Sequence, residues 1–432
     1  MKNIEHITDL CVIGGGMAGI CTAISAARHG IKVVLVQDRG VLGGNASSEI
    51  RMWICGAHGK DNRETGIIEE IMLENFFQNP QLSYSLWDMV LFDKTARQDN
   101  LTLLLNTSCL DANTENGKII SITAWQSPCE TVHTIKARYF ADCSGDSILS
   151  TLTGAHFRYG REAESEFGES IEPKTADKKT MGMSCLFQVR ETDKPQKFTP
   201  PEWAYKYCTD DDIPFREHDL SSNFWWIETG GEGDCIHDTD KCRDELLKIA
   251  YGVWDHIKNH GDHGAENYEL EWVGILPGKR ESRRYVGKYT VTQNDVEAGG
   301  NFDDIIAYAG WSMDDHSPAG INHKTSYPTV FHPAPSPWGI PFRALCSENI
   351  ENLLFAGRNI SVTHAALSSS RVMATCALLG QAVGTAVAQM VQYGENTDNI
   401  DIERLQDSLM ADDCWLPGKN RSVSELSLDL KC

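Results

Sequence analysis

A glycine-rich turn constrains the fold of this 432-residue chain more than any other feature of its sequence. The turn, Gly14-Gly15-Gly16-Met17-Ala18-Gly19, follows a short run of β-forming residues at 10–13 and opens a segment of helical spacing at 17–29. A continuous apolar, β-branched run occupies residues 31–36. Together the segments predict a β-α-β unit, and a GxGxxG pattern in that context indicates a dinucleotide-binding turn.

Each residue in the turn has a physical reason to be there. Gly14 permits the tight turn, Gly16 lets the backbone approach a pyrophosphate, and Gly19 lets the helix pack closely on the strand. Met17 and Ala18 open the helix, whose unpaired N–H groups and dipole favour an anion. We therefore predict that these five residues bind a dinucleotide cofactor.

The end of the second strand is where an acidic residue is expected to bind the ribose hydroxyls. Gln37 stands there, followed by Asp38. An amide can also hydrogen-bond a diol, whereas Asp38 either binds the ribose itself or is a solvated turn residue. Both alternatives stand, because a sequence pattern defines a strand end only to within a residue or two.

Four other segments have sequence motifs that bear on the fold and the cofactor. They are Val36-Gln37-Asp38-Arg39 with Leu42-Gly43-Gly44-Asn45-Ala46-Ser47-Ser48, Ala141-Asp142-Cys143-Ser144-Gly145-Asp146, Pro277-Gly278-Lys279-Arg280-Glu281-Ser282-Arg283-Arg284, and residues 352–382, which begin Asn352-Leu353-Leu354-Phe355-Ala356-Gly357-Arg358. With the glycine turn, they resemble the glutathione-reductase-type FAD-dependent oxidoreductases, and in particular the branch related to heterodisulfide reductase A. The resemblance is weak over about 190–270 and absent in the C-terminal tail.

The resemblance implies FAD as the cofactor. It also implies an α/β fold, a Rossmann-like FAD/NAD(P)-binding domain of the glutathione-reductase type with an inserted mixed α+β cap or substrate domain. Two residues depart from the family pattern, since Gln37 replaces the usual acid and Arg358 stands where an aspartate often holds the ribityl chain. The further residues expected to bind FAD are Gln37, Asp38, Arg39, Gly43, Gly44, Asn45, Ser47, Cys109, Ser144, Gly145, Asp146, Gly357, Arg358, Val372, Met373 and Ala374.

Changes in composition divide the chain into predicted parts. Strands at 272–275 and 284–291 are predicted to be joined by a turn at Pro277-Gly278, and imperfect alternation at 422–432 indicates an edge strand. The predicted parts are residues 1–155 and 335–400 for the FAD-binding domain, 156–334 for the cap or substrate domain, and 401–432 for a C-terminal helix and tail.

The sequence of residues 352–382 predicts a strand at 353–356, a hydroxyl-rich loop and an apolar helix that begins near Arg371. Free N–H groups at 372–375 would stabilise negative charge on a reduced flavin. Residues 372–391 are uncharged and long enough to cross a membrane. Their Ala, Gly, Thr and Gln content instead favours a helix buried in the core.

Two histidines are candidate general bases. His364 lies in the predicted loop before the apolar helix, and His316 follows Asp314 and Asp315, either of which can orient its ring. Arg51 is a candidate for binding a substrate carboxylate or hydroxyl, and the alternative is an ion pair with one of the many acids.

These residues predict an FAD-dependent oxidoreductase that removes two electrons from a small polar metabolite with hydroxyl or carboxyl groups. The electron acceptor, the substrate and the oligomeric state are not defined by the sequence. One alternative is an electron-transfer component of a larger redox complex, which the absence of CxxC spacings disfavours. Another is a flavin-binding protein without catalytic activity.

Charge and cysteine usage narrow the partners and the compartment. Thirty-nine basic and 61 acidic residues give a net charge of −22, which repels phosphate backbones and anionic lipid surfaces. We therefore expect neither nucleic acid nor a membrane as partner. Fourteen scattered cysteines and a polar N-terminus without an export signal indicate a cytoplasmic protein.

Three histidines share a spacing that a metal site on a helix would require. His256, His260 and His263 lie at i, i+4 and i+7, but Gly261 is expected to end the helix before the last of them. A histidine near a helix C-terminus also interacts favourably with the dipole. We therefore predict a solvated helix end and no metal site.

Overall fold

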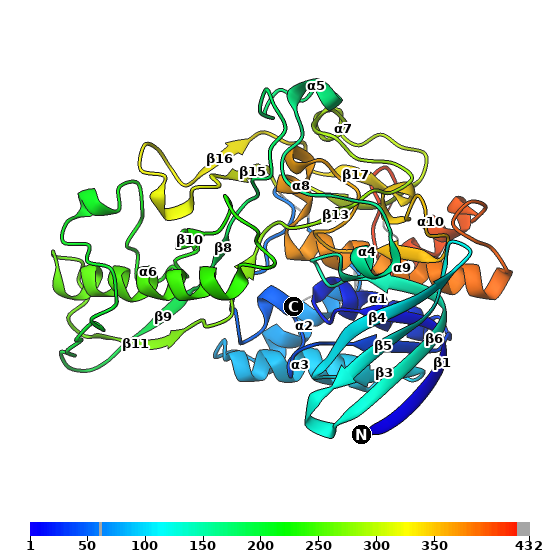
Figure 1. Ribbon diagram of the computed structural model, residues 1–432, viewed down its shortest axis with the longest axis horizontal. Helices are drawn as coiled ribbons and strands as arrows, with labels where there is room; N and C mark the ends of the chain where they lie inside the picture. The colour runs from blue at the N-terminus through cyan, green and yellow to red at the C-terminus, as the bar shows by residue number, and fades with distance from the viewer. Residues whose placement is uncertain (60–62, 421–432) are drawn as a thin grey trace, which may run out of the picture.

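A computed structural model describes residues 1–59 and 63–420 (Figure 1). Its largest sheet has seven strands in the order β3-β2-β1-β6-β5-β4, with β18 also paired to β6. Strands β1, β2, β3, β6 and β18 pair in parallel, whereas β4 and β5 pair antiparallel. The chain therefore has the predicted Rossmann-like α/β sheet. Its strands are β1 (Lys2–Ile13), β2 (Val33–Val36), β3 (Leu101–Leu104), β4 (Thr107–Glu115), β5 (Lys118–Gln126), β6 (Thr131–Asp142) and β18 (Leu353–Phe355).

Helices α1 and α9 pack against each other beside this sheet (Figure 1). Their backbones approach closely: a Cβ atom on Gly380 would lie 2.1 Å from the Ala18 carbonyl oxygen, and one on Gly384 would lie 2.3 Å from that of Thr22. The described helices are α1 (Met17–Arg28), α2 (Ile67–Gln78), α3 (Tyr84–Ala96), α4 (Ile148–Thr153), α5 (Glu164–Phe167), α6 (Thr239–Asn259), α7 (Gln293–Glu297), α8 (His364–Ser370), α9 (Met373–Tyr393) and α10 (Ile402–Ala411).

Helix α9 has the length and composition of a membrane span, with a mean hydropathy of 1.4 over its most apolar window. That window is 94% buried inside the protein. The GxxxG spacing of Gly380 and Gly384 serves the contact with α1, so the prediction of a buried core helix is confirmed.

A second, smaller core lies away from the large sheet, around α6 (Figure 1). The rings of Phe187 and Phe224 stack there with centroids 4.0 Å apart, and Trp254 of α6 meets Phe187 edge-on. We refer to this buried cluster as the smaller core. The strands outside the large sheet are β7 (Phe157–Arg158), β8 (Met183–Ser184), β9 (Phe187–Glu191), β10 (Glu228–Thr229), β11 (Tyr268–Val273), β12 (Gly278–Lys279), β13 (Arg284–Tyr285), β14 (Ile305–Ala309), β15 (Met313–His316), β16 (Thr329–His332) and β17 (Trp338–Pro341).

The predicted turn at Pro277-Gly278 between two strands is wrong, because a further strand lies there. Strand β11 pairs with β9 and strand β13 pairs with β7. Residues Gly278–Lys279 form strand β12, which pairs with β8. The segment after Pro277 therefore continues in a strand, and each of the three strands has a partner that precedes it by many residues in the chain.

The second half of the predicted hydroxyl-rich loop before α9 is a helix, α8. The Thr363 side chain caps this helix by accepting a hydrogen bond from the Ala366 backbone N–H. The edge strand predicted at 422–432 lies outside the described residues.

The contact between α1 and α9 leads to the first prediction. The Gly380→Ala substitution places a methyl group against the Ala18 backbone, which can yield only if the helices separate. We expect the free energy of unfolding to fall by about 1–3 kcal/mol. Chemical denaturation of Gly380→Ala and of a control, Gly233→Ala, tests this, because the Cβ at Gly233 would meet only the Asp238 carboxylate at 3.4 Å. Equal stability of the two variants would contradict the packing argument.

Candidate functional site

A cavity of about 760 Å³ lies at the carboxyl ends of the parallel strands. The loops that follow β1, β2, β6 and β18 all contribute to its lining. Backbone hydrogen bonds connect the first two of these loops: Gly14 N–H donates to Val36 O (2.8 Å), and Gly43 N–H donates to Gly15 O (2.8 Å). This end of a doubly wound sheet is where such folds bind ligands.

Most of the residues predicted to bind the cofactor line this cavity. Three of them do not: Gly19 is buried behind the turn, Ser47 is fully buried, and the Ala374 N–H donates to Cys55 O (3.0 Å). The predicted residues that line the cavity are Gly14, Gly16, Met17, Ala18, Gln37, Asp38, Arg39, Gly43, Gly44, Asn45, Cys109, Ser144, Gly145, Asp146, Gly357, Arg358, Val372 and Met373.

The glycines of the turn differ in what surrounds them. A Cβ atom on Gly14 would lie 2.5 Å from Cys143 O, and one on Gly19 would lie 1.7 Å from Gly14 O, so packing alone requires both glycines. A Cβ on Gly16 would meet only the Gly44 Cα atom, at 3.8 Å. The space beside Gly16 is therefore open and flanked by two glycine backbones, which suits a pyrophosphate.

The structure distinguishes the two residues at the end of β2. Gln37 is buried, its Oε1 accepts from the Gly15 N–H (2.7 Å), and its Nε2 donates to Val41 O (3.0 Å). Its amide thus holds the glycine turn against the loop that follows β2. Asp38 also lines the cavity, and its side chain is 66% exposed, so its carboxylate oxygens remain available to a ligand.

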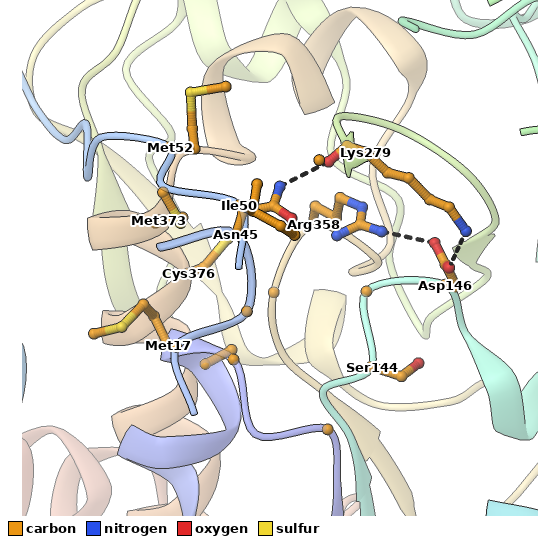
Figure 2. A pocket seen from close by; sticks show the side chains of 18 of the residues that line it. Met17, Asn45, Ile50, Met52, Ser144, Asp146, Lys279, Arg358, Met373 and Cys376 are labelled. Atoms are coloured by element: carbon orange, nitrogen blue, oxygen red, sulfur yellow. Dashed lines mark hydrogen bonds and ion pairs between the residues drawn. The ribbon is translucent and has the colours of Figure 1, made fainter. Parts of the chain in front are cut away.

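An ion-pair network crosses the cavity lining (Figure 2). Asp146 pairs with Arg358 (2.6 Å) and with Lys279 (2.7 Å), and it accepts a hydrogen bond from Ser282. Burial would raise the pKa of Asp146, but the two cations lower it to about 2. The carboxylate therefore stays ionised and holds Arg358, the residue that departs from the family pattern, beside Gly145.

His316 lines the cavity at the end of β15 and is buried. Its Nδ1 lies 2.8 Å from Glu228 Oε2, and its Nε2 lies 3.3 Å from Asp314 Oδ2. Arg371 donates to the same Asp314 oxygen (3.1 Å), and Arg280 lies 3.6 Å from Glu228. The imidazole is thus held between two carboxylates, each of which also has an arginine partner.

Burial would raise the pKa of both carboxylates beside His316. Arg280, His316 and Arg371 instead hold the pKa of Glu228 below its usual range. His316, Arg371 and Thr329 do the same for the pKa of Asp314. Both carboxylates are therefore ionised at neutral pH; Glu228 can accept the Nδ1–H of His316, and Asp314 can accept an Nε2–H once the ring carries a second proton.

The structure places His364 away from the cavity lining. It begins α8 and is 2% exposed, with Nδ1 lying 2.8 Å from Glu281 Oε2 and Nε2 lying 3.2 Å from Asp315 Oδ1. Burial would lower the pKa of His364, but Glu281 and Asp315 raise it well above the usual range. At neutral pH the imidazole therefore carries a proton, which leaves it no lone pair to accept another.

Arg51 does not line the cavity either. Its guanidinium lies over the rings of Tyr84 (4.5 Å) and Trp272 (4.3 Å) and donates to Gln188 (2.6 Å). Among the described residues Arg51 makes cation–π contacts and hydrogen bonds, including one to Ser48 O (3.2 Å), and no ion pair with an acid; its role in substrate binding stays a prediction.

Sequence reasoning missed Glu228, the partner of His316. The only local signal is a single carboxylate in the run Trp225-Trp226-Ile227-Glu228, where apolar residues predict burial. A buried carboxylate needs a cation or several donors, so this isolated acid could have been paired with a distant basic group. Which group it pairs with depends on a contact between residues 88 positions apart.

Comparison with known proteins agrees with this geometry. A family model described as FAD dependent oxidoreductase matches residues 9–409. The glycerol-3-phosphate dehydrogenase of Mycobacterium leprae is 36% identical over 66 residues, which are 15% of this chain and 11% of that protein. A glycerol-3-phosphate dehydrogenase 2 of Mycobacterium tuberculosis matches to the same extent. The chain thus matches about a tenth of the length of these curated relatives.

Solved structures of low similarity were also found. A geranylgeranyl bacteriochlorophyll reductase-like protein of Thermoplasma acidophilum is 13% identical, with a TM-score of 0.42 over 95% of this chain and 84% of that one. The glycerol-3-phosphate dehydrogenase of Bacillus halodurans complexed with FAD is 16% identical, with a TM-score of 0.27 over 45% of this chain and 43% of that one. The family model spans nearly the whole chain, so this protein belongs to the FAD-dependent oxidoreductase family and is an enzyme with FAD as its cofactor.

Proposed function

We propose that this enzyme dehydrogenates a small polar metabolite that carries a hydroxyl group and an anionic group such as a carboxylate. The proposal rests on a hydrogen-bonded series of side chains, Glu228–His316–Asp314–Arg371. The last three of these residues line the cavity that the FAD-binding loops form. When bound, FAD supplies the two-electron chemistry by accepting a hydride from the substrate carbon. The chain's own residues must then bind the substrate and accept the hydroxyl proton.

His316 is the proposed general base. In the neutral ring, Nδ1–H donates to Glu228, which leaves the lone pair on Nε2. Nε2 then accepts the substrate hydroxyl proton, and Glu228 and Asp314 stabilise the imidazolium that results. His364 is the other candidate in the sequence, but its position outside the cavity lining and its raised pKa favour His316.

The charge of the lining supports an anionic ligand. Five cationic side chains and three carboxylates line the cavity, in a chain whose net charge is −22. The pyrophosphate of FAD accounts for part of this local excess. Arg280 and Arg371 lie with His316 and are the proposed partners of a substrate carboxylate or phosphate. The match to glycerol-3-phosphate dehydrogenases, although short, supports this class of hydroxylated anion.

The cofactor is proposed to lie along the carboxyl ends of the parallel strands. The backbones of Gly16 and Gly44 would face its pyrophosphate, and Asp38 would bind the adenosine ribose, since the amide of Gln37 is already occupied. Arg358, held by Asp146, would contact the flavin side. Because the motifs resemble those of the glutathione-reductase type, we propose that the chain belongs to that type and to the branch related to heterodisulfide reductase A.

The placement of FAD predicts two graded effects. The Gly16→Trp substitution fills the open space between Gly16 and Gly44 and should abolish FAD binding. The Asp38→Asn substitution removes a charged acceptor and should weaken binding about ten- to a hundredfold. Calorimetric titration of the apoprotein with FAD measures both effects, with Asp193→Asn, an exposed acid elsewhere, as the control. Wild-type affinity in Asp38→Asn would contradict the assignment of the ribose.

The proposed reaction is tested by flavin bleaching. Sugars, sugar acids, hydroxy acids and glycerol 3-phosphate should be screened anaerobically, and a true substrate should bleach the flavin absorbance band. The His316→Ala substitution should then slow flavin reduction by about 10²–10⁴-fold without changing the FAD spectrum, because it removes the general base. Stopped-flow absorbance measures the rate.

Two variants complete this test. The His237→Ala control removes an exposed imidazole and should leave the rate unchanged. The His364→Ala variant should retain most of the rate, since His364 does not line the cavity. If His364→Ala is slow and His316→Ala is as fast as wild type, the base is His364 and the proposed role of His316 is wrong.

A further inference from the structure

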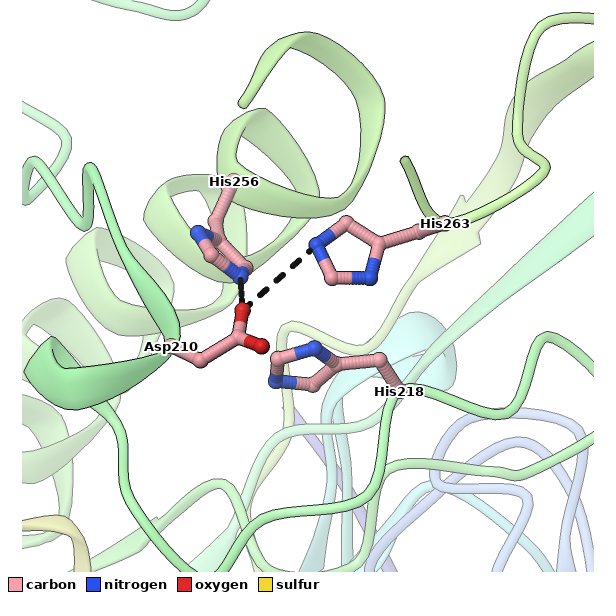
Figure 3. A group of neighbouring side chains, drawn as sticks. All are labelled: Asp210, His218, His256 and His263. Atoms are coloured by element: carbon pink, nitrogen blue, oxygen red, sulfur yellow. Dashed lines mark hydrogen bonds and ion pairs between the residues drawn. The ribbon is translucent and has the colours of Figure 1, made fainter. Parts of the chain in front are cut away.

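Three histidines and one aspartate converge beside the end of α6, next to the smaller core (Figure 3). His256 lies in the last turn of α6, His263 follows that helix, and Asp210 and His218 belong to the segment between β9 and β10. One potential ligand atom from each residue lies within 4.8 Å of those of the other three. The centroids of the three imidazole rings are 4.8 to 4.9 Å apart.

The burial of this cluster corrects the prediction of a solvated helix end. His256 is 1% exposed and the His263 side chain is 13% exposed, so both rings lie inside the protein. His260 alone behaves as predicted, with a side chain that is 38% exposed and that faces Asp255 at 3.4 Å. The helix does end before Gly261, whose φ of +91° turns the chain and brings His263 back toward His256.

The hydrogen-bonding capacity of the cluster is incompletely satisfied. His256 Nδ1 lies 3.1 Å from Tyr207 O, and because a carbonyl only accepts, this nitrogen carries the hydrogen. In the neutral ring, the lone pair of Nε2 then faces Asp210 Oδ1 at 3.1 Å, which places two acceptors against each other. Among the described residues, the buried Nε2 atoms of His218 and His263 have no hydrogen-bond partner.

A proton on His256 Nε2 would relieve only its contact with Asp210, whereas a cation at the centre of the cluster would be bound by one atom of each of the four residues. Three imidazole nitrogens and one carboxylate oxygen form a donor set that suits zinc, because magnesium and calcium prefer oxygen ligands. Four ligands also complete a tetrahedron and leave no open position for a substrate. With nitrogen–zinc distances of about 2.0–2.1 Å, the ligand atoms of a tetrahedron lie roughly 3.4 Å apart. The pair His256 Nε2 and Asp210 Oδ1, at 3.1 Å, is already that close, whereas the pairs that lie up to 4.8 Å apart must approach one another.

We propose that Asp210, His218, His256 and His263 bind a structural zinc ion. The ion would join α6 to the segment at 192–227, whose only regular element among the described residues is a 3-10 turn at Asp210–Asp212. A segment of that length without helix or strand is uncommon in a compact protein unless something holds it. The zinc would supply that restraint.

The restrained segment leads directly to the FAD cavity. Asn223 and Trp225, which line the cavity, lie between His218 and Glu228, the partner of His316. The zinc ion would therefore have a positioning role toward this side of the cavity and would not touch the substrate. Because none of the four ligands lines the FAD cavity, binding of the ion can be measured independently of the proposed dehydrogenase reaction.

Metal analysis of the full chain with FAD bound tests the proposal. The protein is stripped with a chelator and titrated with Zn²⁺ alone by calorimetry, and the dialysed product is analysed by mass spectrometry. We expect one zinc ion per chain and a rise of several degrees in the unfolding temperature, because a ligand that binds only the folded state stabilises it. The His218→Gln and His263→Gln substitutions should weaken zinc binding on the order of 100-fold.

Two further variants keep the test decisive. Asp210 is largely exposed, so Asp210→Asn should fold normally and still weaken zinc binding. His260→Gln removes a neighbouring histidine outside the cluster and should bind zinc as the wild type does. The proposal is overturned if the wild type does not bind Zn²⁺. It is also overturned if Asp210→Asn, His218→Gln and His263→Gln all bind zinc with wild-type affinity, because the ion is then held elsewhere, for example by cysteines.

Discussion

The arrangement of the FAD-binding loops depends on one fully buried carboxylate, that of Asp142, at the carboxyl end of β6. It accepts hydrogen bonds from the Ser144 N–H (2.9 Å), the Leu149 N–H (2.9 Å) and the Tyr285 hydroxyl (2.6 Å). The Asn359 amide donates to the Asp142 carbonyl oxygen (3.3 Å). Burying a carboxylate is costly unless donors surround it, so these contacts restrict the loops after β6 and β18 to one relative position.

A second set of interactions, two ion pairs, connects segments that lie around the cavity. Asp146, in the loop after β6, pairs with Lys279 of β12, and Glu228 of β10 pairs with His316 of β15. Each pair joins elements that are far apart in the sequence. The proposed base is thus oriented by contacts that form only when the smaller core has packed against the FAD-binding part, which links the stability of this packing to the geometry of the site.

Elements that depend on a local sequence pattern are predicted correctly, whereas features that depend on contacts between distant residues are not. The β-α-β unit at 10–36 and the buried helix α9 have strong local patterns, and the sequence predicts both correctly. The partners of β11, β12 and β13 are chosen by tertiary contacts, which no local pattern encodes. The same reason explains why sequence reasoning misses Glu228 and the burial of His256: each depends on residues that the fold brings from other segments.

The pairing of β18 with β6 has a consequence for how the protein is made. Leu353 aligns with Phe140, so more than two hundred residues of chain must be synthesised between these two neighbours. Contacts between such distant segments form slowly, because the entropy of closing the loop is lost before the contact stabilises the fold. Gly357 and Arg358 follow β18 directly and complete the lining of the cavity. A ribosome-bound chain therefore exposes the glycine turn long before the residues that complete the lining of the cavity have been synthesised.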